Sequence, residues 1–241
     1  MSRLVCATVL LAGTASAQEL KLWYDKPARN WSADALPLGN GRLGCMVFGG
    51  VERERIQFNE DSLWTGDENP TGDYKTMGAY QNFGDLLIDL GAGGTEAKPS
   101  TADGYERALS LAEAEHRVTF KKDGVTHTRT AFASHPDEVI VLRWTADRAG
   151  AISGVIKLQG AHGETAQAEG AALSFTGTLK NGLAYEARAH VLAKGGAVEP
   201  AGSGLQLRGC DEVLILLAAG TSYVADHGKK PPKITAHRDD A

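Results

Sequence analysis

The sequence has few cysteines, few prolines, no excess of positive charge and almost no long hydrophobic runs. Its 25 Lys and Arg are outnumbered by 30 Asp and Glu, so the 241-residue chain carries a net charge of −5. Without a basic surface to neutralise phosphates, nucleic-acid binding is disfavoured. An apolar fraction of 42% is enough for a hydrophobic core, which excludes disorder as the main state.

The longest compact apolar stretch lies at the N-terminus. Arg3 precedes an apolar run over residues 4–12, and Ala15-Ser16-Ala17 has the small-x-small pattern of a signal-peptidase site. The run is too short to cross ~30 Å of hydrocarbon as a stable anchor. We therefore predict a signal peptide over residues 1–17, a mature chain that starts at Gln18, and a secreted or periplasmic protein without a membrane partner. The alternative is an N-terminal core helix.

Cysteine and histidine are too few and too scattered to indicate a metal centre. Cys6 lies within the predicted signal peptide, so only Cys45 and Cys210 remain, each among small or apolar neighbours. Such residues commonly behave as small buried hydrophobes, although a Cys45–Cys210 bridge stays open in an exported protein. The seven His residues show no zinc-ligand spacing. We expect neither a metal nor a cofactor.

Glycine is abundant and the chain alternates short apolar/polar segments with turn signals. The 29 Gly residues make up about 12% of the chain, against a usual ~7%. Asp123-Gly124 and Asn181-Gly182 each separate two such segments and predict two-residue hairpin turns. In the first hairpin, His127 would face Phe120 and not His116. Further strands are expected at residues 43–48, 55–58, 84–90, 139–144, 152–158, 205–207 and 212–217. Ten or more short strands predict an all-β fold, a large twisted antiparallel β-sandwich.

Three segments bear on domain organisation. Residues 105–115 are rich in helix formers, yet Tyr105, Arg107 and Leu109 share one face at period two, and we predict a strand. Residues 91–104 form a polar loop with strand patterns on both sides, so they do not divide two domains. One domain is expected over residues 18–226, with a linker or tail over 227–241, where Pro231-Pro232 lies.

Carboxylates are the first candidates for chemistry, because paired acids are the commonest hydrolytic apparatus of extracellular proteins. Glu60 and Asp61 are adjacent, so in a regular strand their side chains would point to opposite faces and could not flank one bond. Acids and arginines alternate over residues 52–55, which is typical of a solvated edge strand. No G-x-S-x-G nucleophile motif occurs, and Gly39-Asn40-Gly41 is interpreted as a turn, since it lacks the lysine of a phosphate-binding loop.

Aromatic residues cluster in the first third of the chain. Nine of the sixteen lie between residues 23 and 83: Trp23, Tyr24, Trp31, Phe48, Phe58, Trp64, Tyr74, Tyr80 and Phe83. Large rings beside Asn, Asp and Glu suit sugars, whose C–H faces stack on rings while their hydroxyls bond to carboxylates and amides. The alternative is that the rings pack in the core or at a domain contact.

The same stretch resembles the opening of glycoside hydrolase family 95, and the resemblance runs in order from about residue 22 to residue 223. The matching segments are residues 26–28, Trp31, 35–44 (ALPLGNGRLG), 46–50 (MVFGG), 54–66 (ERIQFNEDSLWTG), 83–86 (FGDL), 105–111, 129–136 (RTAFASHP) and 220–223 (GTSY). The resemblance also favours a strand at residues 105–111. It departs at Cys45 and Cys210, where the family tends to have alanine.

The resemblance implies an N-terminal β-super-sandwich of the galactose-mutarotase-like type. Members of the family are inverting α-L-fucosidases, with some α-L-galactosidases, in which a catalytic (α/α)6 barrel follows the sandwich. Their catalytic motifs lie in that barrel and have no counterpart here, so no catalytic residue is assigned. The chain is expected to be the non-catalytic N-terminal domain of a truncated or split enzyme, inactive alone, with the barrel in cis or from a neighbouring reading frame as its partner.

Two alternatives remain from the residues themselves. The chain could be a stand-alone carbohydrate-binding or adaptor module for fucosylated or galactosylated glycans, or a structural domain with an exposed partner surface. In either case, the candidate substrate-binding or barrel-facing residues are Asn59, Glu60, Asp61, Trp64 and Trp31.

Overall fold

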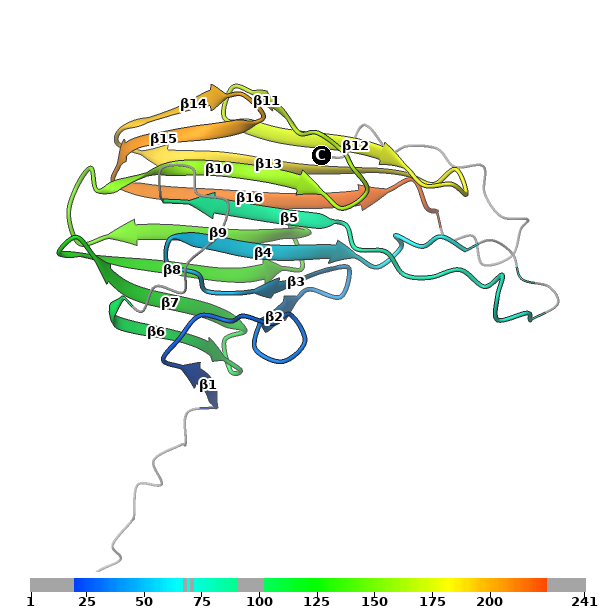
Figure 1. Cartoon of the computed structure of the whole chain (residues 1–241), viewed down its shortest axis with the longest axis horizontal. Coiled ribbons are helices and arrows are strands. Elements are labelled where there is room, and N and C mark those ends of the chain that lie inside the picture. The colour runs from blue at the N-terminus through cyan, green and yellow to red at the C-terminus, as the bar shows by residue number, and fades with distance from the viewer. Residues whose placement is uncertain (1–19, 67–68, 70–71, 91–101, 225–241) are drawn as a thin grey trace, which may run out of the picture.

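The computed structural model of the chain describes residues 20–66, 69, 72–90 and 102–224. These residues form sixteen strands in two antiparallel sheets, and no helix occurs among them (Figure 1). The prediction of a large all-β antiparallel sandwich is therefore confirmed. In the same ranges there is no helix long and apolar enough to span a membrane. The predicted signal peptide, the predicted tail and most of the polar loop at 91–104 lie outside the described residues.

One sheet has nine strands in the order β1-β6-β7-β8-β9-β16-β13-β12-β11. Most neighbouring strands of this sheet are consecutive in the chain and are joined by hairpins. The exception at its centre is β16, which lies between β9 and β13. The strands are β1 (Lys21–Tyr24), β6 (Asp103–Ser110), β7 (Glu115–Lys122), β8 (Val125–Ser134), β9 (Val139–Ala146), β11 (Gln167–Glu169), β12 (Ala172–Thr178), β13 (Ala184–Lys194) and β16 (Glu212–Thr221).

The other sheet has seven strands in the order β14-β15-β10-β5-β4-β3-β2. Its strands are β2 (Leu36–Gly39), β3 (Leu43–Val47), β4 (Arg53–Glu60), β5 (Gly84–Asp89), β10 (Ile152–Gly160), β14 (Ala197–Ala201) and β15 (Gly204–Cys210). Burial alternates strictly along β4, because successive side chains of a strand point to opposite faces. The inward set includes Ile56 and Phe58, which pack with Trp144 of the facing sheet in one core between the two layers.

The two predicted hairpins have different turns. Lys122 pairs with Val125 across Asp123-Gly124, which confirms the two-residue turn and places His127 opposite Phe120. In the second hairpin Thr178 pairs with Ala184, and Leu179 N donates to Leu183 O at 2.9 Å. The loop therefore has three residues, 180–182, and the expected two-residue Asn-Gly turn is wrong. Gly182 supplies the positive φ of 88° that a three-residue loop needs at its last position.

Two further expectations are settled by strand pairing. Residues 103–110 form β6, so the strand prediction for the ambiguous segment is confirmed for residues 105–110. It is wrong for residues 111–114, which form the turn to β7. The interpretation of residues 52–55 as a solvated edge strand is wrong. They lead into β4, which lies between β3 and β5 inside the seven-stranded sheet. An interior strand turns every second side chain into the core, and here that position is Glu54.

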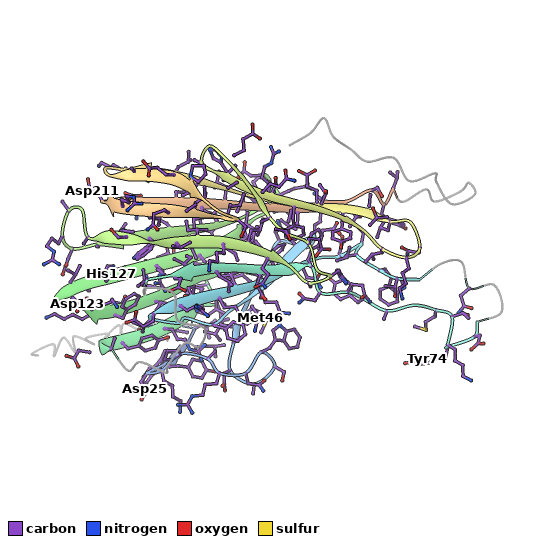
Figure 2. The ribbon with its side chains drawn as sticks, turned by 45° about the horizontal axis from the view of Figure 1, so that its top comes forward. Asp25, Met46, Tyr74, Asp123, His127 and Asp211 are labelled. Atoms are coloured by element: carbon purple, nitrogen blue, oxygen red, sulfur yellow. The ribbon has the colours of Figure 1, made fainter. Side chains whose placement is uncertain are left out.

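The two ends of the sandwich differ. One end carries the β3–β4 and β7–β8 turns. From the other end the connection between β4 and β5 projects away from the sheets (Figure 1), and we call its described residues, 61–66, 69 and 72–83, the arm. Figure 2 shows Tyr74 on the projecting part of the arm, remote from Asp123 at the opposite end of the molecule. Most of the residues predicted to be functional therefore lie where β4 ends and the arm begins.

Candidate functional site

Glu60 is the last residue of β4, and its side chain points inward. It is only 3% exposed, and its carboxylate accepts hydrogen bonds from the Ser62 backbone N at 2.9 Å and from Ser62 Oγ at 2.7 Å. Arg42 Nε lies 3.3 Å from the other carboxylate oxygen. Both oxygens are therefore occupied by groups of the protein itself.

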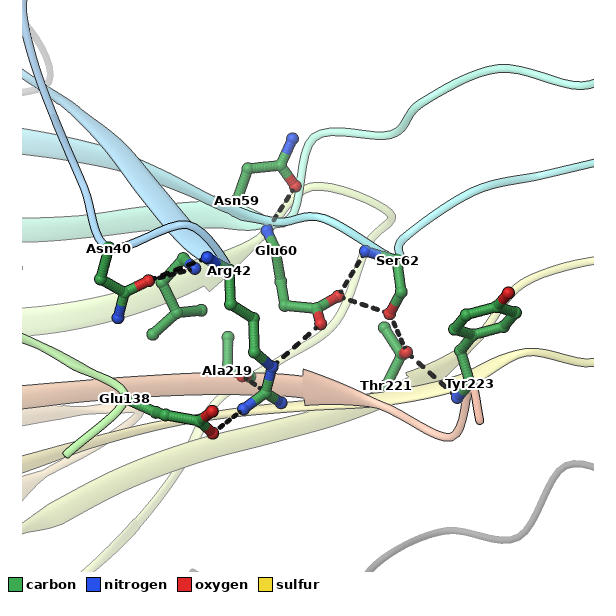
Figure 3. Close-up of polar contacts among 10 residues, drawn as sticks. Asn40, Arg42, Asn59, Glu60, Ser62, Glu138, Ala219, Thr221 and Tyr223 are labelled. Atoms are coloured by element: carbon green, nitrogen blue, oxygen red, sulfur yellow. Dashed lines mark hydrogen bonds and ion pairs between the residues drawn. The ribbon is translucent and has the colours of Figure 1, made fainter. Parts of the chain in front are cut away.

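These contacts continue across the sandwich, as Figure 3 shows. Ser62 Oγ also contacts Thr221 Oγ1 at the end of β16, and Arg42 pairs with Glu138 in the β8–β9 turn. We call these five residues, Arg42, Glu60, Ser62, Glu138 and Thr221, the clasp. Because β4 and β16 belong to different sheets, the clasp holds the two layers together at the end from which the arm projects.

Asn40 positions the arginine of the clasp. Its Oδ1 accepts hydrogen bonds from the backbone N of Arg42 at 3.0 Å and of Leu43 at 2.7 Å, while its Nδ2 donates to Ser134 O at 2.7 Å. Gly41 adopts a φ of 99° within this turn. The interpretation of Gly39-Asn40-Gly41 as a turn is therefore confirmed. A hollow of about 280 Å³ lies beside it, lined by Asn40, Gly41, Arg42, His135 and Glu138.

The two adjacent acids differ in access. Burial raises the pKa of Glu60, hydrogen bonds from Ser62 oppose that effect, and the charge of Asp61 raises the pKa further. Asp61 itself is exposed in the turn after β4. The chain does turn at this point, but it leaves one carboxylate enclosed and one in solvent. Glu60 and Asp61 are therefore not two open acids across one cleft.

The other predicted site residues lie in separate places. Trp64 is at the root of the arm and contacts Tyr80 in a tilted arrangement, with ring centroids 6.4 Å apart. Asn59 lies on β4 opposite Gly44, and its Oδ1 accepts a hydrogen bond from Glu60 N at 3.0 Å. Trp31 lies in the turn before β2, the edge strand of the seven-stranded sheet, whose first residue pairs with Val47 at the end of β3. The structure brings Asn59, Glu60, Asp61 and Trp64 to one end, and it places Trp31 elsewhere.

A buried ion pair at the opposite end of β4 was missed by sequence reasoning. The side chains of Glu54 and Arg129 are 1% and 2% exposed, and Arg129 Nη1 lies 3.4 Å from Glu54 Oε2. Glu54 also accepts a hydrogen bond from Gly49 N at 2.7 Å. The sequence does contain an indication of this pair, because Arg129 falls on the same face of its hairpin strand as apolar residues that point inward. An arginine at such a position needs a buried partner.

The surroundings of this pair leave no open site. The Arg129 guanidinium lies 4.9 Å from the ring centroids of both Phe120 and Trp144. Tyr105 Oη donates to Gly49 O at 2.7 Å, and Arg107 lies over the ring of Tyr24. We call Gly49, Glu54, Tyr105, Arg107 and Arg129 the closed cluster. Its charged residues are all buried, and Tyr105 is half-buried at its edge. Burial raises the pKa of Glu54, and the charge of Arg129 lowers it.

The remaining candidate ligands do not assemble. Cys45 and Cys210 are both free and buried, and burial raises the pKa of the Cys45 thiol to about 12. His116 is buried beside Arg107, and burial with the nearby positive charge lowers its pKa to about 3. Within the described residues, no group of three or more His, Cys, Asp or Glu side chains is placed to hold a metal ion.

Comparison with known proteins gives a consistent result. A family model described as "Glycosyl hydrolase family 65, N-terminal domain" matches residues 22–79 and 71–226. The chain is 31% identical to "Alpha-L-fucosidase 2" of Arabidopsis thaliana over 60% of its own length and 20% of that protein. It is 29% identical to "Probable alpha-fucosidase A" of Aspergillus niger over 94% of its length and 33% of that protein.

The chain thus spans a third or less of the length of these relatives. Among solved structures, it is similar to "Putative kojibiose phosphorylase from human microbiome". The match has a TM-score of 0.42 and 11% identity, over 77% of this chain and 30% of that one.

Proposed function

The chain belongs to the family of glycosyl hydrolase family 65 N-terminal domains, and from this premise we propose that it is the non-catalytic N-terminal domain of a secreted α-L-fucosidase-like glycoside hydrolase. The full-length enzyme would hydrolyse terminal α-L-fucosyl residues. The observation that carries the proposal is the alignment with the A. niger relative. It takes in 94% of this chain but only 33% of a protein named for fucosidase activity.

The state of the carboxylates supports a non-catalytic role. An inverting glycosidase needs two acids ~6.5–9.5 Å apart that both reach the substrate, one of them with a raised pKa. Glu54 and Glu60 are the carboxylates of the described residues whose pKa is raised. Both are buried, and both are bonded to groups of the protein. Neither can donate a proton to a glycosidic oxygen without dismantling the closed cluster or the clasp.

The proposal includes a partner and a location. Catalysis requires an (α/α)6 barrel, either in the same polypeptide or encoded in a neighbouring frame. Val224, the last described residue, follows Tyr223, whose backbone N donates to Thr221 Oγ1 at 3.2 Å. The described part of the chain therefore ends beside Thr221 of the clasp. Export by the signal peptide at residues 1–17 would place the enzyme where glycans are accessible.

The test is to express the chain together with the reading frame directly downstream of it. We expect a helical barrel to be encoded there, to co-purify with this chain, and to release fucose from 2′-fucosyllactose only when this chain is present. N-terminal sequencing of the exported protein should give Gln18. A downstream region without any barrel, or a barrel that is fully active and stable without this chain, would contradict the proposal.

A further inference from the structure

Trp64 and Tyr80 form an exposed pair of rings at the root of the arm. Trp64 is 38% exposed and Tyr80 is 50% exposed, although the two rings contact each other at a tilt of 40°. The pair is not covered by any other ring of the described residues. Part of each ring thus stays open to solvent. What distinguishes these two rings from the other exposed aromatic residues is that they contact each other and form one surface.

The pair is held rigidly. Trp64 Nε1 donates to Met77 O at 2.9 Å, which fixes the indole ring. The two sides of the arm are joined where Thr65 N donates to Ala79 O at 3.0 Å, and Asn181 from the β12–β13 loop donates to Trp64 O at 2.9 Å. A rigid aromatic surface loses little conformational entropy when a ligand binds to it.

Glycines allow the two sides of the arm to meet closely beneath the rings. A Cβ on Gly66 would lie 2.4 Å from Trp64 Nε1, and one on Gly78 would lie 2.2 Å from the Gly66 Cα. Gly78 also has a φ of 77°. The backbone geometry that presents the ring pair therefore depends on glycine at both positions.

Polar groups border the rings. Burial raises the pKa of Tyr80, and the charges of Glu60 and Asp61 raise it further. No described residue is hydrogen-bonded to the Tyr80 hydroxyl, which is free to donate to a ligand. Asp61 is exposed and accepts hydrogen bonds as a carboxylate. Apolar faces beside a hydroxyl and a carboxylate match the mixed surface of a sugar, which has C–H faces and hydroxyl edges.

We infer that Trp64 and Tyr80 form a carbohydrate-binding platform, with Asp61 and the Tyr80 hydroxyl as polar contacts. Its ligand is a neutral oligosaccharide with a terminal 6-deoxyhexose, whose methyl group and C–H face stack on the rings. The choice of this sugar class rests on the proposed function, whereas the platform itself rests on the geometry. The second ring is Tyr80 and not Trp31, which lies in the turn before β2. Glu60 is 3% exposed and bonded within the clasp, so it does not contact the ligand.

The experiment is a calorimetric titration of the full chain with 2′-fucosyllactose, and with lactose as the ligand that lacks the deoxysugar. We expect heat with 2′-fucosyllactose and at least roughly tenfold weaker binding of lactose. Trp64→Ala and Tyr80→Ala should each weaken binding of 2′-fucosyllactose by about tenfold or more, and Asp61→Asn by a few-fold. Trp31→Ala is the matched control, since Trp31 is 52% exposed, and it should leave binding unchanged.

The Tyr80→Ala variant keeps the hydrogen bond from Trp64 to Met77, so it tests the ring pair without disturbing the arm. Each variant must have the melting temperature of the wild type. The inference is overturned if 2′-fucosyllactose gives no heat up to on the order of 10 mM. It is equally overturned if Trp31→Ala weakens binding as much as Trp64→Ala, or if lactose binds as tightly. None of these outcomes bears on the proposed function, which depends on turnover with the barrel.

Discussion

Glu54 and Glu60 lie on the same inward face of β4, near its two ends. The two glutamates differ in their bonding partners and in their distance from the surface. Both carboxylates are buried, and burial raises the pKa of each. Glu54 is neutralised by Arg129 inside the closed cluster, away from any surface. Glu60 is held by Ser62 and Arg42 in the clasp, directly below an exposed arm. A buried acid with a raised pKa is therefore not by itself a catalytic acid, because its bonding partners and its access to solvent decide its role.

The largest effect is expected at the closed cluster. Arg129→Met leaves the Glu54 carboxylate buried without its cation, which should lower the free energy of unfolding by ~3–5 kcal/mol. Equilibrium urea unfolding measures the change. The double variant Glu54→Gln with Arg129→Met should recover much of that loss. A loss below ~1 kcal/mol for Arg129→Met would show that the pair is not buried as described.

Gly49→Ala tests the packing of the same end. Gly49 has a φ of 72°, and an added Cβ would lie 2.7 Å from Tyr105 Oη and 2.9 Å from Arg107 Cδ. The left-handed backbone and the overpacking should together cost ~2–4 kcal/mol. Gly202→Ala is the control, since Gly202 has a φ of 63° and no atom within 4 Å of its added Cβ. Equal losses for the two variants in urea unfolding would refute the contact with Tyr105 and Arg107.

His116 makes the closed end sensitive to acid. Its pKa in the folded chain is lowered to about 3, below the ordinary value of 6.5. Between these values the unfolded chain binds a proton that the folded chain does not, so stability falls as pH is lowered through this window. The slope is at most ~1.4 kcal/mol per pH unit. His116→Gln should remove that slope between pH 6 and pH 4 in urea unfolding. An unchanged slope in the variant would contradict the assignment to His116.

The smallest effect is expected at the clasp. Ser62→Ala removes a hydroxyl donor to Glu60 and the contact with Thr221, and should cost ~1.5 kcal/mol. The effect should be local, with faster hydrogen exchange at residues 63–66 and unchanged exchange in β8. Ser32→Ala removes a comparable but exposed bond to Asn30 and should cost no more than ~0.5 kcal/mol. Faster exchange in β8 as well would mean that the two ends are not independent.

Sequence reasoning predicted the architecture better than it predicted the site. Period-two patterns and an Asp-Gly turn were sufficient for the β7–β8 hairpin and its register, because both are local properties. The position of β4 inside its sheet depends on pairing with β3 and β5, which local alternation does not reveal. Glu54 was therefore misinterpreted as solvated. Its partner Arg129 lies on the opposite sheet, and only the packing of the two layers brings the two together.

The ring pair shows the same limit. Trp64 was identified as a candidate from composition, but its partner Tyr80 returns along the far side of the arm, and no spacing rule connects them. Trp31 was equally aromatic and equally close to polar residues in the sequence, yet it lies apart from the pair. The number of rings could be counted from the sequence, whereas their grouping required the fold.

The most direct test of the central claim, that this chain is a glycosidase domain without catalytic machinery of its own, is the release of fucose from 2′-fucosyllactose by the purified chain alone. We expect no turnover above the buffer control, for the wild type and for Glu60→Gln alike. Measurable turnover that disappears in Glu60→Gln would contradict it, because Glu60 would then be a working acid and not a buried part of the clasp.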